Sequence, residues 1–309
     1  MAGTNGFSNM NILVFDIETI PDIASGRRLY GHPAEMALLS SEDVARVMSH
    51  YRQQQTDGQS DMLRHHLQQV IAISVVFRFR GKVKNKDTGQ VEEKDILDVR
   101  SLAQPEASEK ELLQQFFNII KKYTPNLVSW NGNGFDLPVL HYRCLLHGVN
   151  MQRYWEKEQI DDDYVLSNFG QKRRVHFQYN KYFNRYNERH LDLMDVLSGY
   201  QSKVFASLDE IATMLGLPGK MGMSGDKVWE AYLRGEIGQI RDYCETDVLN
   251  TYLIYLRFEQ MRGNLGAVEY LQECQRVHQL LLHESKPHFT AFAESWQRSE
   301  EFKQLIPIG

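Results

Sequence analysis

The stretch Asn11-Ile12-Leu13-Val14-Phe15-Asp16-Ile17-Glu18-Thr19 is an apolar run that ends in two carboxylates separated by one residue. Side chains alternate along a strand with a period of two, so a strand here presents Asp16 and Glu18 on the same face. Two like charges at this spacing repel each other, and a cation between them relieves the repulsion. An isolated Asp-x-Glu is more often a solvated strand end, because the pattern is short and common. Its meaning therefore depends on the rest of the chain.

The composition is that of a globular protein with one large domain or two small ones. The chain has 309 residues, of which 42% are hydrophobic and 24% charged, and its net charge is −5. This charge excludes a protein that coats nucleic acid by bulk positive charge, but it leaves room for a local basic groove. The three cysteines lie far apart without metal-ligand spacing. We therefore expect a reduced, intracellular and cytoplasmic setting. No apolar run approaches the roughly 18 residues of a membrane span.

Hydrophobic periodicity and turn signals predict an α/β chain. Strands are expected at residues 11–17, 70–77, 96–99 and 127–130, with an antiparallel meander over residues 70–100. Helices are expected at residues 34–55, 60–69, 109–120, 136–147, 208–215, 236–259 and 265–283. Capping boxes at Ser108–Glu111 and Ser207–Glu210 mark the starts of two of these helices. Residues 1–9 are polar and are expected to form a disordered lead-in.

Two later stretches also contain acidic residues that could belong to the same site. In Asn131-Gly132-Asn133-Gly134-Phe135-Asp136, two glycines allow a sharp turn or a close backbone approach, and Asp136 stands at the start of a helix. Taken alone, this stretch is better explained as a plainly capped helix. In Tyr243-Cys244-Glu245-Thr246-Asp247, the first and last residues are four apart in a long helix and share a face. A surface helix on which Tyr and Asp are merely neighbours is the plain alternative.

In this order the three stretches resemble the motifs of the DEDDy exonucleases, a proofreading group with a ribonuclease H-like core. The chain is most similar to the predicted 3′–5′ exonuclease family related to the proofreading domain of B-family DNA polymerases. The likeness runs from about Asn11 to about Leu256 and is specific only when the three motifs are taken together. It implies an α/β fold with a mixed sheet, antiparallel in its first strands and then parallel, flanked by helices. The implied domain covers residues 10–264, with a helical insertion at 21–69 and a packed helical extension at 265–309.

The resemblance also implies the site. Four carboxylates are expected to hold two divalent ions, Mg²⁺ or Mn²⁺, and these are Asp16, Glu18, Asp136 and Asp247. Both metals prefer oxygen ligands, which carboxylates supply. Tyr243 is expected to orient the attacking water, since a phenol with an ordinary pKa near 10 is a poor base. The implied reaction is hydrolysis at the 3′ end of DNA with release of 5′-mononucleotides.

Contacts with a single-stranded 3′ end are expected from Thr19, Asn131, Phe135, Arg173, Arg174 and Lys220. The two arginines lie in a stretch, residues 172–189, where basic and aromatic side chains are interleaved. That composition suits phosphates and bases, and it suits a tyrosine-rich hairpin packed on the domain equally well. Lys220 lies in a glycine-rich loop that lacks the Walker pattern, so a plain loop is the simpler interpretation. Phe135 and Trp130 either flank the terminal base or belong to the core.

Two alternatives to a DNA exonuclease remain open. A 3′–5′ exoribonuclease would carry the same motifs, because they do not distinguish DNA from RNA. A nucleic-acid-binding module of the same fold that has lost hydrolysis is the second alternative, although all four carboxylates and Tyr243 are present. A polymerase is not expected, since no stretch outside the core is long enough for that domain.

Overall fold

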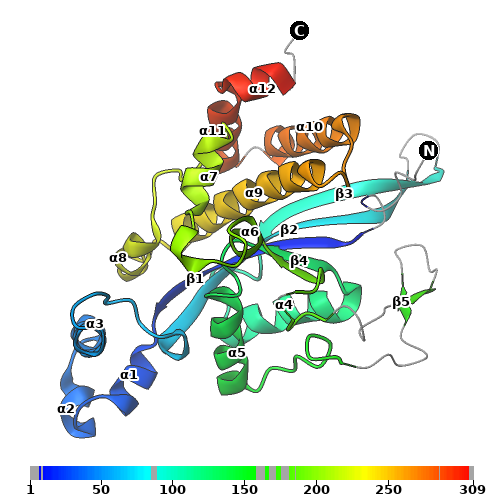
Figure 1. The fold of residues 1–309 in the computed structure, drawn as a ribbon. Helices are drawn as coiled ribbons and strands as arrows, with labels where there is room; N and C mark the ends of the chain where they lie inside the picture. The colour runs from blue at the N-terminus through cyan, green and yellow to red at the C-terminus, as the bar shows by residue number, and fades with distance from the viewer. Residues whose placement is uncertain are drawn as a thin grey trace.

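The computed structural model describes residues 7, 10–84, 89–157, 164–166, 172–174, 181–184, 186–284 and 286–305. A mixed sheet with the strand order β3-β2-β1-β4-β7 lies at its centre (Figure 1). The strands are β1 (Ile12–Pro21), β2 (Gln68–Lys84), β3 (Val91–Ser101), β4 (Asn126–Ser129) and β7 (His190–Asp192). The first three pair antiparallel, whereas β4 runs parallel to β1 and β7 parallel to β4. The predicted mixed sheet, antiparallel in its first strands and then parallel, is therefore confirmed.

Strand β1 is central because it is apolar on both faces. Ile12 and Val14 belong to one hydrophobic core, which includes residues of α9 (Ile237–Met261) and α10 (Ala267–Glu284). Leu13 and Phe15 belong to a second core on the other face, with residues of α4 (Glu109–Tyr123) and α5 (Asp136–His147). Alternation along the strand thus supplies both cores, as a sheet covered by helices on its two faces requires.

Local sequence signals set several helix boundaries. Both predicted capping boxes form, Ser108 with Glu111 at α4 and Ser207 with Glu210 at α7 (Leu208–Met214). Each satisfies backbone amides that the first helical turn leaves unpaired. Shorter segments link the larger elements, namely α6 (Leu193–Leu197), α8 (Val228–Leu233) and the 3₁₀ turns η2 (His65–Leu67), η3 (Ser202–Val204) and η4 (Gly225–Lys227).

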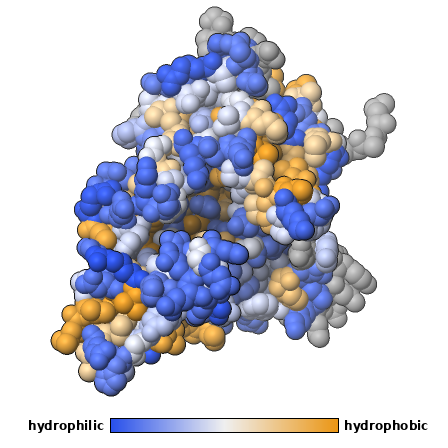
Figure 2. Space-filling view, turned by 60° about the vertical axis from the view of Figure 1, so that its left-hand side comes forward, coloured by the Kyte–Doolittle hydropathy of each residue, from blue (hydrophilic) through white to orange (hydrophobic). Residues whose placement is uncertain are grey.

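Between β1 and β2 the chain forms three helices, α1 (Ile23–Leu29), α2 (Pro33–Leu38) and α3 (Ser41–Gln55). They extend beyond the end of β1 at the lower left of Figure 1. The helix expected at residues 60–69 is wrong, because residues 68–70 pair with 19–21 of β1 and only η2 precedes them. Hydrophobic side chains gather over this helical insertion at the lower left of Figure 2, and Leu29 and Leu38 are exposed there.

A buried ion-pair group joins the insertion to the core. Arg143 of α5 is 3% exposed and contacts Asp22, the N-cap of α1, and Glu109 at the start of α4. Glu109 also accepts the amide of Val70 at 2.7 Å, at the point where the chain returns from the insertion. The group therefore holds together both ends of the insertion and two helices on one face of the sheet.

The C-terminal helices pack on the opposite face, where α10 lies beside α9, followed by α11 (Pro287–Gln297) and α12 (Glu300–Leu305). Arg78 of β2 is buried and pairs with Glu273 of α10 at 2.9 Å. Its guanidinium also lies 4.7 Å from the ring centre of Phe7. The expected disordered lead-in is therefore corrected at Phe7, which is buried in this core, while residues 1–6, 8 and 9 lie outside the described part.

Two further observations concern the basic stretch that begins at residue 172 and the question of a membrane span. Strands β5 (Tyr164–Leu166) and β6 (Lys172–Arg174) pair as an antiparallel two-stranded sheet. Among the described residues, no helix has the length and apolar character needed to cross a membrane.

Candidate functional site

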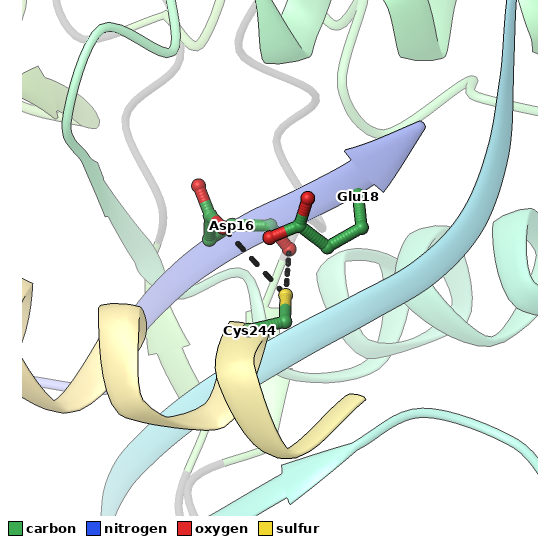
Figure 3. A group of neighbouring side chains, drawn as sticks. All are labelled: Asp16, Glu18 and Cys244. Carbon is green, nitrogen blue, oxygen red and sulfur yellow. Dashed lines mark hydrogen bonds between the residues drawn. The ribbon is translucent and has the colours of Figure 1, made fainter. Parts of the chain in front are cut away.

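The first acidic pair, Asp16 and Glu18, lies in the part of β1 that extends beyond the end of the parallel strand β4. Strand β4 pairs with β1 only as far as Val14, so the following residues of β1 lie past the carboxyl end of β4. Asp16 and Glu18 sit in this overhang on the face that α9 covers, as Figure 3 shows. A register shift between Glu18 and Thr19 interrupts the pairing with β2 immediately afterwards. Such bulges commonly re-aim side chains beside a site.

The second acidic stretch forms a tight loop that returns Asp136 to β1. The amide of Ile17, which β4 leaves without a strand partner, donates to Oδ1 of Asp136 at 3.2 Å. Asp136 is the first residue of α5 and Phe135 occupies the N-cap position, so the alternative in which Asp136 caps the helix does not hold. Gly132 is required by close packing, since a Cβ there would lie 2.2 Å from Oγ of Ser129.

Two acids of the 190–195 stretch hold this loop in place. Asp192 accepts the amides of Asn131 at 3.0 Å and Asn133 at 2.8 Å. Asp195 accepts the side-chain amide of Asn133 at 2.9 Å. The conformation that brings Asp136 to Ile17 therefore depends on residues about 60 positions further along the chain.

The third acidic stretch comes from the middle of α9. Tyr243 and Asp247 share a face as predicted, and the tyrosine side chain lies close enough to the carboxylate to lower its pKa. Cys244 is fully buried and its thiol faces Asp16, with Sγ 3.6 Å from Oδ2 (Figure 3). Ligand atoms of Asp16, Glu18 and Cys244 all lie within 4.8 Å of one another. Cys244 was not among the predicted site residues, although its position three residues before Asp247 on the helix was an available signal.

All four carboxylates are destabilised in their ionised form. Burial, followed by repulsion from Asp136 and Asp247, raises the pKa of Asp16 well above its usual value. Burial and repulsion from Asp16 do the same to the pKa of Glu18. Burial raises the pKa of Asp136 to about 7 and that of Asp247 to about 6. The structure thus brings these four groups into mutual electrostatic reach, with Glu18, Asp136 and Asp247 buried and Asp16 half-buried.

This donor set fits divalent metal ions. Four carboxylates offer the hard oxygen ligands that Mg²⁺ and Mn²⁺ prefer. Oδ1 of Asp247 is buried and has no hydrogen-bond partner, which is costly unless a further group occupies that position. A cation would supply that partner and would remove the repulsion that raises the pKa values.

A prediction about stability follows from the raised pKa of Asp136. A carboxyl group that titrates near 7 when folded and near 4 when unfolded destabilises the fold progressively as pH rises through that interval. We therefore expect Asp136→Asn to be more stable than wild type in chelator at pH 7, with a smaller loss of stability between pH 4 and 7. The amide oxygen can still accept the Ile17 amide, so the loop should keep its shape.

Metal should reverse the order of stability, so that wild type becomes more stable than Asp136→Asn. Metal that binds only the folded site adds roughly 2.7 kcal/mol at about 100 times its dissociation constant, and Asp136→Asn should gain less. Thermal unfolding in chelator and across a Mn²⁺ titration measures both effects. A mutant no more stable than wild type in chelator, with an undiminished Mn²⁺ response, would separate Asp136 from the carboxylate cluster.

The residues expected to contact nucleic acid differ in their burial, in their partners and in whether they reach the carboxylate cluster. Thr19 is half-buried, and its hydroxyl donates to Gln68 at 3.0 Å. Phe135 is half-buried against the ring of His65, 5.7 Å away between ring centres. Asn131 is held by Asp192 through its backbone, with a left-handed φ of 64°. Lys220 is exposed, and its charge lowers the pKa of both Glu18 and Asp247, so it lies within reach of the cluster.

Trp130 and the basic stretch fit the core interpretation better where they are described. Trp130 is half-buried against the α9 core. Tyr182 is 1% exposed and donates its hydroxyl to the carbonyl of Pro125 at 2.6 Å, so it is unavailable for stacking on a base. Tyr186, in contrast, is 74% exposed. The backbone of Arg173 and Arg174 forms β6, but their side chains lie outside the described residues, and their role stays a prediction.

Glu245 lies within the third motif but outside the carboxylate cluster. It accepts from Lys286 at 3.0 Å, from the ring of His288 at 2.8 Å and from the amide of Ser101 at 2.7 Å. Despite its burial, the hydrogen bonds from His288 and Lys286 hold its pKa at about 2. Asp242 joins the same group through His288 at 3.1 Å. Because Lys286 and His288 both contact Glu245, this group is a polar network that fastens α11 to α9.

Comparison with known proteins identifies the class. Residues 60–296 match a family described as a predicted 3′–5′ exonuclease related to the exonuclease domain of PolB. The match covers well over half of the chain, and the protein belongs to this family of nucleases. The second and third acidic motifs lie inside the matched region, whereas Asp16 and Glu18 precede it.

Two polymerases show partial similarity. The chain is 31% identical over 121 residues to DNA polymerase 1 of Sulfurisphaera ohwakuensis, covering 36% of this chain and 13% of the polymerase. It aligns with the structure of the family B DNA polymerase from Pyrobaculum calidifontis at a TM-score of 0.40 and 16% identity, covering 93% of this chain and 26% of the polymerase. The chain therefore spans about a quarter or less of either polymerase.

Proposed function

We propose that the protein is a two-metal-ion 3′–5′ exonuclease that hydrolyses the terminal phosphodiester bond of DNA and releases 5′-mononucleotides. The observation that carries the proposal is the convergence of Asp16, Glu18, Asp136 and Asp247 from β1, α5 and α9 into one cluster. Membership of an exonuclease family supports the reaction class. Similarity to DNA polymerases supports DNA as the substrate.

The four carboxylates are proposed to hold the metal ions. When bound, two Mg²⁺ or Mn²⁺ ions supply an activated nucleophile, neutralise phosphate charge and stabilise the leaving oxygen. Asp16 would be a ligand of these ions, because it projects from the rigid central strand and its carboxylate lies within 4.8 Å of that of Glu18. The thiol of Cys244 donates to Asp16 and so helps to fix its orientation.

Tyr243 is proposed to position the attacking water. Burial, and then the negative charges of Asp247 and Glu18, raise its pKa above the usual value. The phenol therefore stays protonated at all ordinary pH values and cannot serve as a base. Its hydroxyl can still hold a water molecule by hydrogen bonding, because the side chain lies one helical turn from Asp247.

Tyr243→Phe tests this role. The variant should lower the single-turnover rate of nucleotide release by about 10- to 100-fold, since a misplaced reactant costs up to that factor. Mn²⁺ affinity and DNA affinity should stay nearly unchanged, because the hydroxyl would act mainly in the transition state. Quench-flow kinetics and equilibrium binding measure the two effects separately. A variant that turns over as fast as wild type would exclude a role for the hydroxyl.

The experiment that tests the function uses single- and double-stranded DNA and RNA labelled at either end, with Mg²⁺ and Mn²⁺ added separately. We expect 5′-mononucleotides released from the 3′ end of single-stranded DNA, and no release in chelator. Preferential degradation of RNA would make the protein an exoribonuclease. Tight binding without metal-dependent release would identify a module that has lost hydrolysis.

A further inference from the structure

The thiol of Cys244 lies beside two carboxylates of the site, as Figure 3 shows. Its sulfur is 3.6 Å from Oδ2 of Asp16 and 3.5 Å from the main-chain carbonyl of the same residue. Ligand atoms of Asp16, Glu18 and Cys244 all lie within 4.8 Å of one another. We call these three residues the thiol–carboxylate group. It adds a soft sulfur atom to hard oxygen donors, and hydrolysis with Mg²⁺ or Mn²⁺ does not require sulfur.

The separation of sulfur and oxygen fits a zinc-like ion. A tetrahedral site with a Zn–S bond of about 2.3 Å and a Zn–O bond of about 2.0–2.2 Å places the two ligand atoms about 3.5–3.7 Å apart. The observed separation between Cys244 and Asp16 is 3.6 Å. Glu18 is at most 4.8 Å from either ligand atom, and rotation of its longer side chain can close that gap. The group therefore offers three of the four ligands of a tetrahedral ion.

An unpaired oxygen next to the group also indicates a missing cation. Asp247 lies three residues after Cys244 on α9 and is 7% exposed. Its Oδ1 is buried and finds no hydrogen-bond partner within the described part of the chain. Its charge reaches both Asp16 and Glu18. A buried oxygen without a partner is costly, and an ion held by the neighbouring thiol–carboxylate group would lower that cost.

The surroundings of the thiol can support a negative sulfur. Ser74 of β2 is fully buried and pairs with Asp16 across the two strands. Cross-strand partners project from the same face of a sheet, so the Ser74 hydroxyl faces α9 as well. Burial raises the pKa of Cys244, and this hydroxyl acts to lower it. Metal ligands usually have such outer hydrogen-bond partners, which hold them in position.

We propose that Cys244 is a direct ligand for thiophilic divalent ions of the Zn²⁺ class, which bind at the thiol–carboxylate group and inhibit the enzyme. Thiolate ligands select such ions, whereas Mg²⁺ and Mn²⁺ prefer oxygen. On binding, the S–H bond breaks, an S–metal bond forms and the proton leaves to solvent, because a coordinating thiol is deprotonated. An ion held by sulfur occupies Asp16 and Glu18, so these carboxylates are lost to the ions that support hydrolysis. Only the inhibition rests on the proposed exonuclease function.

Cadmium absorption tests the ligand without any measurement of activity. Cd²⁺ bound to a thiolate has an ultraviolet sulfur-to-metal charge-transfer band, which Cd²⁺ bound only to oxygen lacks. Wild type titrated with Cd²⁺ should develop this band, and Cys144→Ser and Cys274→Ser should keep it. Cys244→Ser should lose the band and bind Cd²⁺ at least about tenfold more weakly, since even a partner that merely supports a ligand contributes about 10- to 100-fold. Its affinity for Mn²⁺ should change much less.

Two further variants keep the test decisive if Cys244→Ser does not fold. The double variant Cys144→Ser/Cys274→Ser retains Cys244 as its sole cysteine, so a band in that protein must come from Cys244. Asp16→Asn should weaken the Cd²⁺ affinity measured by the band, because Asp16 shares the ion. The proposal is overturned if wild type binds Cd²⁺ without the band. It is also overturned if the band survives Cys244→Ser, or if Asp16→Asn leaves the affinity unchanged.

Inhibition is measured separately, as nucleotide release from single-stranded DNA at fixed Mg²⁺ across a Zn²⁺ titration. Each protein is compared with its own rate without Zn²⁺. The Zn²⁺ concentration that halves the rate should be at least about tenfold higher for Cys244→Ser than for wild type. Equal concentrations for the two proteins would refute inhibition through Cys244. If wild type releases no nucleotide with any metal, the exonuclease function fails, while the absorption band still decides whether Cys244 is a ligand.

Discussion

Asp16→Ala and Asp247→Ala are each expected to lower nucleotide release by on the order of 10³-fold or more, because a lost ligand removes several kcal/mol of transition-state stabilisation. Neither variant should unfold, since each deletes a carboxylate whose ionised form is disfavoured in the folded protein. Single-turnover assays in Mg²⁺ and in Mn²⁺ measure the loss. Calorimetric titration with Mn²⁺ provides a second readout, in which both variants should bind more weakly.

The matched control is Asp61→Ala, which removes an exposed carboxylate from the insertion. It should keep wild-type turnover and Mn²⁺ affinity, because a solvated side chain outside the cluster contributes little to either. Turnover near the wild-type rate in purified, folded Asp16→Ala or Asp247→Ala would refute the proposed two-metal mechanism.

Arg143→Leu is expected to cause the largest loss of stability, about 3–5 kcal/mol in the free energy of unfolding at pH 7. The substitution leaves Asp22 and Glu109 buried without the guanidinium that contacts both. Urea denaturation in chelator measures the change. Arg46→Leu is the control, because Arg46 also lies near two carboxylates but its side chain is 75% exposed. It should change stability by roughly 0.5 kcal/mol or less.

The pH dependence distinguishes a lost ion pair from a packing defect. Burial acts to raise the pKa of Asp22, but hydrogen bonds from Ser25 and Arg143 hold it below the usual value. This carboxylate therefore stabilises wild type above its unfolded pKa near 4, and the contribution is lost as pH falls through the folded value. The difference between wild type and Arg143→Leu should shrink below about pH 4. A gap that stays constant from pH 7 to pH 3 would show that packing alone causes the loss.

The sequence by itself determined the elements that depend on neighbours within about one turn. The capping boxes at Ser108 and Ser207 close through contacts three residues apart, so both helix starts were predictable. The alternation of β1 between two cores was readable in the same way. The three acidic motifs also stood in the sequence in their order, although the resemblance and not their local pattern linked them.

Only the tertiary structure decided which polar groups meet. Asp136 could have capped α5, but the free amide of Ile17, 119 positions away in the chain, binds its carboxylate instead. Glu245 shares a motif with Asp247, yet α11 supplies Lys286 and His288 and draws it into an ion-pair network. In the sequence, Cys244 was one of three cysteines that lie far apart. Only the packing of α9 against β1 places its thiol beside Asp16.

The same distinction explains the predictions that were wrong. Residues 60–69 carry a helix-like composition, but pairing of residues 68–70 with the end of β1 satisfies their backbone in a strand. For the basic and aromatic stretch two interpretations were open, and at Tyr182 the packed one holds, because the carbonyl of Pro125 is a buried partner for its hydroxyl. Contacts over such separations depend on how helices and strands pack, and a local pattern of side chains does not encode that packing.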